Sequence, residues 1–227
     1  MNLTDNLKYI LNSNESEELF YKIYLPHLLE LNKIIKKSSG CLEGNIFYFN
    51  DSKDLSELHL DFKDKRKNTA KFANLVDVIV EVGFNAGHSA LLILSSNNEV
   101  IYKGIDINCH TYTLPCFNHL KNYFHDRIDL SLGNSLDVLP KVFNIYPKIK
   151  NKKIGWIIDG CHDIDVANKD LKTILKLCSV DDIILFDDTE RGGKLRDLID
   201  VYVLSNKIKI VLDYNHQLFL KKCNDNL

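Results

Sequence analysis

Hydrophobic positions recur every three or four residues near the start of the chain. Over residues 17–37 this spacing predicts an amphipathic helix, and Pro26 is expected to kink or restart it. The stretch 38–72 has no regular pattern and contains glycine breaks, so irregular structure with short helices is predicted there. Its charged run at residues 63–67 is expected to be a solvated face.

A different pattern begins at residue 76, where short β-branched runs alternate with polar turns and longer helical segments. This alternation is typical of a parallel sheet with crossover helices. The predicted strands are residues 76–82, 100–106, 128–132, 154–159 and 182–187. A helix is expected at 194–204, and two apolar runs at 208–212 and 217–220 then predict an antiparallel edge hairpin.

Composition narrows the function classes. The 227 residues suffice for one α/β domain with a short appendage, and 45% hydrophobic with 26% charged residues is an ordinary globular balance. The net charge of −2 disfavours nucleic acid and anionic lipid as partners. No apolar run approaches the roughly 18 residues of a membrane span, and no signal peptide is apparent. Six cysteines without C-x-x-C spacing predict free thiols, so a cytoplasmic protein is expected.

The turn after the first predicted strand contains two glycines. Gly83 allows a sharp turn, and Gly87 allows a ligand to approach the backbone just before an apolar helix. The free N–H groups of that helix start favour an anionic group. A dinucleotide fingerprint would have glycine at Asn85, which argues against pyrophosphate binding. The alternative is a plain strand-to-helix turn.

Acidic residues end three further strands. Asp106 lies about 20 residues beyond the glycine turn, where an acid can accept both ribose hydroxyls. Asp159 follows the fourth predicted strand, and Asp187 with Asp188 follows the fifth. Open α/β sheets bind ligands at these carboxyl ends, and three carboxylates there could share one divalent cation. Helix capping is the alternative for each acid. Ser135 starts a helix after the third strand, where its hydroxyl could reach an adenine.

Together these motifs resemble those of class I S-adenosylmethionine-dependent methyltransferases, in particular the metal-dependent O-methyltransferases of the catechol and caffeoyl-coenzyme A type. The resemblance covers roughly residues 76–220. The E-x-G-x-x-x-G-x-S-A turn of that family is matched by Glu81, Gly83, Gly87, Ser89 and Ala90. The later motifs, G-x-S-x-D-x-x-P, D-G-x-H and an acidic strand end, are matched by Gly133, Ser135, Asp137, Pro140, Asp159, Gly160, His162, Asp187 and Asp188.

The resemblance implies a doubly wound α/β fold with a seven-stranded, mainly parallel sheet and an antiparallel final strand. It implies a methyltransferase domain at 73–227 and a helical or irregular extension at 1–72 that covers the substrate. The residues expected to bind S-adenosyl-L-methionine are Glu81, Gly83, Phe84, Asn85, Gly87, His88, Ser89, Asp106, Asn134, Ser135 and Asp159. Those expected to bind Mg²⁺ or another divalent cation are Asp159, Asp187 and Asp188.

Two departures from the family pattern stand out. The fifth strand ends Asp-Asp where many relatives have Asp-Asn, which changes the charge around a metal. The sequence Ser-Val-Asp-Asp at 179–182 replaces the usual glycine-rich turn before that strand.

The predicted function is O-methylation of a small-molecule or sugar hydroxyl, with Asp159 and His162 as catalytic residues. His162 is the candidate base, and the alternative is a loop histidine that only hydrogen-bonds a carboxylate. The expected partners are the small-molecule methyl acceptor and a second copy in a homodimer, without nucleic acid or membrane. Two other functions are a methyltransferase-like protein that binds the cofactor without turnover, and a nicotinamide-dependent oxidoreductase. Asn85 and the lack of a Tyr-x-x-x-Lys relay disfavour the last.

Overall fold

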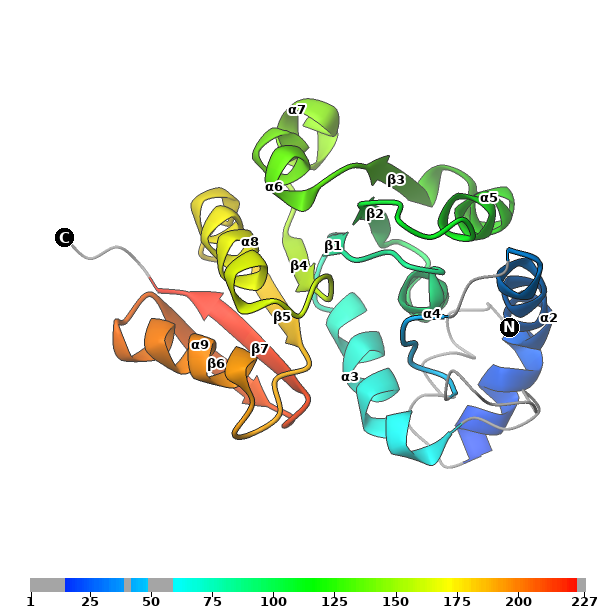
Figure 1. Ribbon diagram of the computed structural model, residues 1–227, viewed down its shortest axis with the longest axis horizontal. Coiled ribbons are helices and arrows are strands. Elements are labelled where there is room, and N and C mark those ends of the chain that lie inside the picture. Colours follow the sequence, from blue (N-terminus) through cyan, green and yellow to red (C-terminus); the bar gives the residue numbers. More distant parts are fainter. Residues whose placement is uncertain (1–14, 39–41, 49–58, 224–227) are drawn as a thin grey trace. The chain divides into compact units, whose positions relative to one another are not determined.

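The computed structural model describes residues 15–38, 42–48 and 59–223. They form two compact units, each described here by itself (Figure 1). The first unit holds the described residues of Met1–Asn74 together with Phe84–Tyr102 and Asn108–Asp129. The second holds Leu75–Gly83, Lys103–Ile107 and the described residues from Leu130 onward.

The first unit is helical. It contains α2 (Glu15–Lys37), η1 (Leu60–Phe62), α3 (Lys63–Ala73), α4 (His88–Ser96), α5 (Thr113–Phe124) and η2 (His125–Arg127). The predicted N-terminal helix is confirmed, but it does not restart at Pro26, which lies inside one continuous helix. The ends of α3 and α4 are tied together because Asn97 Nδ2 donates to Ala73 O at 2.9 Å.

The expectation of a solvated charged face at residues 63–67 is wrong for one residue. Arg66 is 2% exposed. Its Nη1 donates to the carbonyl oxygens of Ile46 and His59, each at 3.0 Å. A charged side chain is buried only when hydrogen bonds replace its hydration, and these two carbonyls come from the irregular segments around α3. Arg66 therefore stabilises the segments on which the sequence showed no pattern.

The second unit holds most of a seven-stranded sheet in the order β3-β2-β1-β4-β5-β7-β6, while the first residues of β2 and β3 count to the first unit. The strands of the sheet are β1 (Val78–Val82), β2 (Ile101–Asp106), β3 (Ile128–Leu132), β4 (Ile154–Ile158), β5 (Ile183–Asp187), β6 (Ile208–Asp213) and β7 (Gln217–Lys222). β1, β4 and β5 pair in parallel, whereas β7 is antiparallel to both β5 and β6. The predicted doubly wound sheet with an antiparallel final strand is confirmed.

Burial explains why the central strands have uninterrupted apolar runs. Every residue of β1, β4 and β5 is buried, as expected for parallel strands covered on both faces. In the edge strand β6 only Ile208 is buried, and the following residues alternate between exposed and half-buried. The carboxyl ends of β1, β4 and β5 thus lie at one edge of the sheet, which is where an α/β sheet presents its ligand-binding residues.

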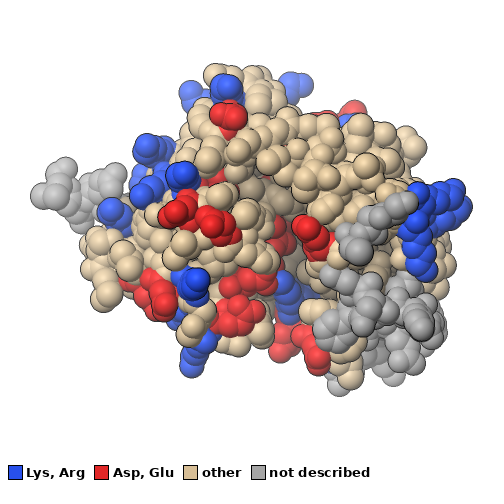
Figure 2. Space-filling view, in the orientation of Figure 1, with Lys and Arg blue, Asp and Glu red and all other residues tan. Residues whose placement is uncertain are grey.

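Short and long helices complete this unit: α6 (Ser135–Val138), η3 (Leu139–Lys141), α7 (Val142–Ile145), η4 (Pro147–Ile149), α8 (Ile164–Leu177) and α9 (Lys194–Leu204). Asp163 caps α8 by accepting hydrogen bonds from the N–H groups of Asp165 and Val166. Figure 2 shows acidic and basic side chains interspersed over α8, α9 and β6 on the face drawn. Among the helices that the structure describes, none combines the length and apolar character of a bilayer span.

A buried carboxylate organises the turn before β5. Asp182 is 4% exposed and accepts hydrogen bonds from Ile154 N (2.9 Å), Trp156 Nε1 (3.2 Å) and Ser179 N (2.9 Å). These three donors join the turn, β4 and the single tryptophan of the chain. Asp182 therefore stabilises the turn that replaces the family's glycine-rich one.

The described cysteines are free thiols, as predicted, while Cys41 lies outside the described residues. Burial raises the pKa of Cys116 to about 12 and that of Cys178 to about 11, so both are inert at neutral pH.

Candidate active site

Gly83 ends β1 with a conformation that only glycine adopts easily. Its φ is +100°, and its N–H donates to Ile105 O at 2.9 Å. A Cβ at this position would overlap the backbone carbonyl of Asp159. The close approach that requires glycine here is therefore made by the end of β4, and it brings the ends of β1, β2 and β4 together.

The ends of β2 and β3 are also joined. Gly133 N donates to Asp106 O at 2.8 Å, and the Asp106 side chain is 9% exposed. Asn134 caps α6, since its side chain accepts from Leu136 N at 3.0 Å. Asp106, Asn134 and Ser135, all predicted as cofactor residues, thus lie at the neighbouring ends of these two strands.

Ser135 has a partner that sequence reasoning missed. Its hydroxyl donates to the carboxylate of Asp170 on α8. Burial raises the pKa of Asp170, which is 1% exposed, and the hydrogen bond from Ser135 opposes that rise. The sequence does hold a signal for this contact, because Asp170 lies among the apolar positions Ala167, Leu171 and Ile174 of the amphipathic helix α8.

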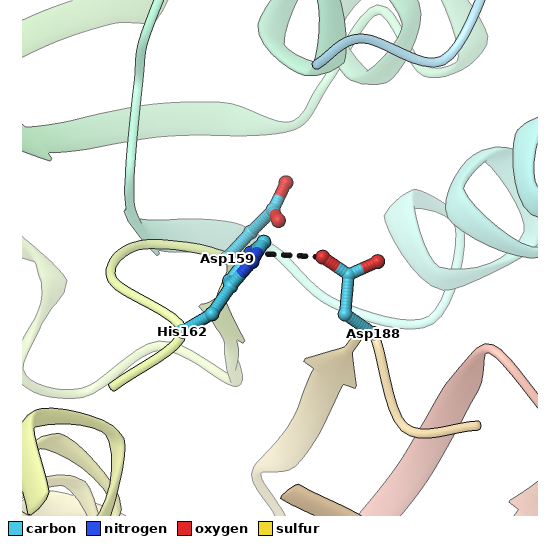
Figure 3. Close-up of side chains that lie close together, drawn as sticks. All are labelled: Asp159, His162 and Asp188. Atoms are coloured by element: carbon cyan, nitrogen blue, oxygen red, sulfur yellow. Dashed lines mark ion pairs between the residues drawn. The ribbon is translucent and has the colours of Figure 1, made fainter. Parts of the chain in front are cut away.

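Asp159, His162 and Asp188 form the most chemically distinctive cluster of the second unit (Figure 3). One ligand atom of each residue lies within 4.8 Å of the others. His162 Nε2 is 2.8 Å from Asp188 Oδ2, and the two side chains are 64% and 30% exposed. Asp159 follows β4 and Asp188 follows β5, so adjacent parallel strands position both carboxylates.

Asp187 is not part of this cluster. It is the last residue of β5, 4% exposed, and pairs in register with Gln217 of β7. Successive side chains of a strand point to opposite faces, and Asp188 then leaves the strand with φ of +53°. Of the three predicted metal ligands, the structure brings together Asp159 and Asp188, and His162 is the third member of the group among the described residues.

The loop residues predicted to contact the cofactor belong to the first unit. Phe84 is buried, with its ring centroid 6.0 Å from that of Phe117. A Cβ at Gly87 would meet Phe84 Cζ at 2.6 Å and Leu120 Cδ1 at 2.7 Å. Within this unit the close approach at Gly87 is thus made by protein side chains, whereas the sequence argument assigned it to a ligand.

Asn85 contacts the segment before α3. Its Nδ2 donates to Glu43 O and, at 3.1 Å, to Gly44 O, and its Oδ1 accepts from Tyr112 Oη at 2.7 Å. The side chain that stands in place of the fingerprint glycine therefore links three segments of the first unit.

His88 and Ser89 begin α4. His88 is 4% exposed, its Nε2 lies 3.1 Å from Tyr48 Oη, and burial lowers its pKa to about 4. The ring is therefore buried and neutral at pH 7, and the assignment of His88 to the cofactor stays a prediction.

Comparison with protein families matches residues 80–189 to a methyltransferase domain family. This segment runs from β1 to the loop after β5 and includes the Asp159, His162 and Asp188 cluster. Residues 80–189, just under half of the chain, are thus similar to a methyltransferase domain. The predicted recognition and enzyme class are confirmed. No curated protein sequence matches the chain.

Solved structures share this fold at low sequence identity. The TDP-rhamnose 3'-O-methyltransferase CalS11 of calicheamicin biosynthesis is 15% identical, with 92% of this chain and 95% of that chain covered and a TM-score of 0.56. The methyltransferase PaMTH1 of Podospora anserina, bound to SAH, is 15% identical, with coverage of 86% and 88% and a TM-score of 0.59. MycE, bound to Mg, SAH and mycinamycin VI, is 16% identical, with coverage of 86% and 55% and a TM-score of 0.51.

Proposed function

We propose that the protein is an S-adenosylmethionine-dependent O-methyltransferase that acts on a hydroxyl of a small molecule or sugar, with His162 as general base. The observation that carries this proposal is the His162–Asp188 pair at the strand ends of a methyltransferase domain. CalS11 and MycE support the substrate class, since the first is named for TDP-rhamnose and the second is bound to the small molecule mycinamycin VI.

The second unit offers residues that fit the cofactor. Asp106 presents a carboxylate for ribose hydroxyls at the end of β2, and Asn134 and Ser135 stand at the next strand end. A nucleoside bound across these strand ends would place its ribose at Asp106 and its adenine at Asn134 and Ser135. S-adenosylmethionine supplies an electrophilic sulfonium methyl group when it is bound. The assignment of Glu81, Gly83, Asp159 and the loop residues 84–89 to the cofactor stays a prediction.

The Asp159, His162 and Asp188 cluster fits a divalent cation by its donors. Two carboxylates from adjacent strands match the oxygen ligands of Mg²⁺ or Mn²⁺, and His162 keeps its role as the base beside them. A cation at Asp159 and Asp188 would lower the pKa of a coordinated hydroxyl. Asp187 remains a predicted ligand, and residues 1–72 remain a predicted cover for the substrate.

The geometry of His162 suits a base. With Nε2–H donating to Asp188, the neutral ring carries its lone pair on Nδ1, and this is the nitrogen that would take the proton of the substrate hydroxyl. Asp188 holds the ring in that tautomer and stabilises the imidazolium that forms, as a carboxylate does behind any catalytic histidine. The 64% exposed ring can return the proton to solvent.

Ligand binding and turnover test the proposal separately. In a thermal-shift assay, S-adenosylmethionine and its demethylated product should raise the Tm while NAD⁺ should not, since a ligand at 100 times its Kd adds about 2.7 kcal/mol. Stabilisation by NAD⁺ alone would favour the oxidoreductase.

Methyl transfer from labelled cofactor to a panel of sugar nucleotides, glycosides and phenols then tests catalysis. Where an acceptor is found, His162→Gln should lower kcat by about 10²- to 10⁴-fold, and the matched control Cys161→Ser, in the same exposed loop, should not. Equal kcat values for His162→Gln and wild type would show that His162 is not the general base. A cofactor binder that methylates nothing in the panel would support the non-catalytic alternative.

A further inference from the structure

Two histidines face each other where α2 and α5 pack within the first unit. His27 Nδ1 lies 3.2 Å from His119 Nε2, and the ring centroids are 5.3 Å apart with 53° between the planes. The ring of Tyr123 lies 4.2 Å from that of His27. Both histidines are partly exposed, so a small ion from solvent has access to their nitrogens.

The spacing of the two nitrogens suits a shared metal. With Zn–N bonds of about 2.0–2.1 Å and a tetrahedral angle, two imidazole nitrogens stand about 3.3 Å apart. A direct hydrogen bond at 3.2 Å is also within range, at the long end for two nitrogens. The test therefore has to separate a metal-binding pair from a hydrogen-bonded pair.

The protonation state also suits a metal. Burial lowers the pKa of His27, and the neighbouring His119 lowers it further. Burial also lowers the pKa of His119, against an opposing effect of Glu30. Both rings are therefore neutral at pH 7, which is the form that binds metals.

One carboxylate acts electrostatically on this pair without belonging to a three-ligand group with it. Glu30 lies three residues after His27, on the same face of α2, and its charge acts on His119. Its carboxylate accepts from Lys33 Nζ at 3.1 Å in an exposed pair, which contributes little and exchanges readily.

We propose that His27 and His119 form a two-histidine, zinc-class metal site that links α2 to α5. Two imidazoles favour Zn²⁺ or Cu²⁺ over Mg²⁺. The site is independent of the Asp159, His162 and Asp188 cluster, which lies in the other unit. Its effect is on the position and stability of the N-terminal helix.

Calorimetric titration of the chelator-treated full-length chain with ZnCl₂ tests the site. Wild type should bind one equivalent of Zn²⁺ that both His27→Gln and His119→Gln lose or bind more than about tenfold more weakly. His125→Gln, which removes an exposed histidine just after α5, is the matched control and should keep it. His162→Gln should also keep it, whatever it does to Zn²⁺ bound at the other cluster.

Cu²⁺ gives a second readout that a hydrogen-bonded pair would not produce. The electron paramagnetic resonance spectrum of wild type should show coupling to two imidazole nitrogens, reduced to one in either single variant. His119→Asn serves if a glutamine variant does not fold. Unchanged Zn²⁺ stoichiometry and unchanged Cu²⁺ spectra in folded His27 and His119 variants would overturn the site. If His162→Gln bound no Zn²⁺ at all, the Zn²⁺ of the wild type would be bound at the Asp159, His162 and Asp188 cluster. That result would also overturn the site at His27 and His119, and the proposed function would stand.

Discussion

His162 Nε2 lies 2.8 Å from Asp188 Oδ2, which joins the loop after β4 to the loop after β5. Asp188 reaches this position from a left-handed backbone conformation, φ +53°, that asparagine and aspartate tolerate better than other side chains. The Asp-Asp strand end thus gives the chain a full negative charge opposite the histidine, where an asparagine would give a neutral amide.

Divalent-ion response should separate the two carboxylates of the cluster. Asp159→Asn should lose most of the stabilisation and activation by Mg²⁺ or Mn²⁺, because no neighbouring carboxylate at the end of β4 can replace it. Asp188→Asn recreates the Asp-Asn strand end of many relatives and should keep part of the response. Thermal unfolding and initial rates over a metal titration, with chelator reversal, give the measurement. Equal responses in both variants and wild type would show that Asp159 and Asp188 do not bind the cation.

Asp106→Ala should abolish most cofactor binding while the fold is retained. A charge-assisted hydrogen bond to a ribose hydroxyl contributes about 1.5–3 kcal/mol, which is roughly 10- to 150-fold in Kd. Calorimetry with S-adenosylhomocysteine measures it, and Asp137→Ala, on the exposed side of α6, is the control. Unchanged affinity in a folded Asp106→Ala protein would place the ribose elsewhere.

The order and ends of the strands could be predicted because each central strand is a short apolar run that ends in a polar turn. β3 (Ile128–Leu132) and α9 (Lys194–Leu204) begin and end at the predicted residues. α3 was not predicted as a long helix, since its stability depends on burying Arg66 against carbonyls of distant segments, an interaction with no local sequence signal.

The candidate site was predictable only as far as strand ends determine it. Asp159 and Asp188 follow adjacent parallel strands, so their proximity follows from the topology. That Asp187 does not belong to the group of Asp159, His162 and Asp188 depends on how the chain leaves β5, and the Ser135–Asp170 contact depends on how α8 packs. Both are tertiary features that no spacing of residues encodes.

Asp182→Ala should destabilise the protein strongly. It would leave three donors, including the Trp156 indole, without their acceptor in a buried site, at a cost of about 3–5 kcal/mol. Asp182→Asn keeps an acceptor oxygen and should cost less. Urea unfolding followed by Trp156 fluorescence measures both, and the exposed neighbour variant Asp181→Ala is the control. Equal midpoints for Asp182→Ala and Asp181→Ala would contradict the role of this carboxylate.

His88 should make the stability of the protein fall in mild acid. Its pKa is lowered by burial from 6.5 to about 4, so between these values the unfolded chain binds a proton that the folded chain does not. The contribution is fully present above pH 6.5 and is lost as the pH falls towards 4. The loss between pH 7.5 and 4.5 is on the order of 2.5 kcal/mol.

His88→Gln removes the titrating ring and keeps a polar group near Tyr48 Oη. The difference in unfolding free energy between pH 7.5 and 4.5, measured by urea titration, should therefore shrink by about 2.5 kcal/mol in this variant. It should be unchanged in His125→Gln, whose imidazole is exposed. Comparing the pH dependence rather than the stability at one pH separates the protonation effect from any packing cost of the substitution. Superimposable pH profiles for His88→Gln and wild type would mean that His88 is protonated at pH 4.5 in the folded protein, and that its ring is hydrated there.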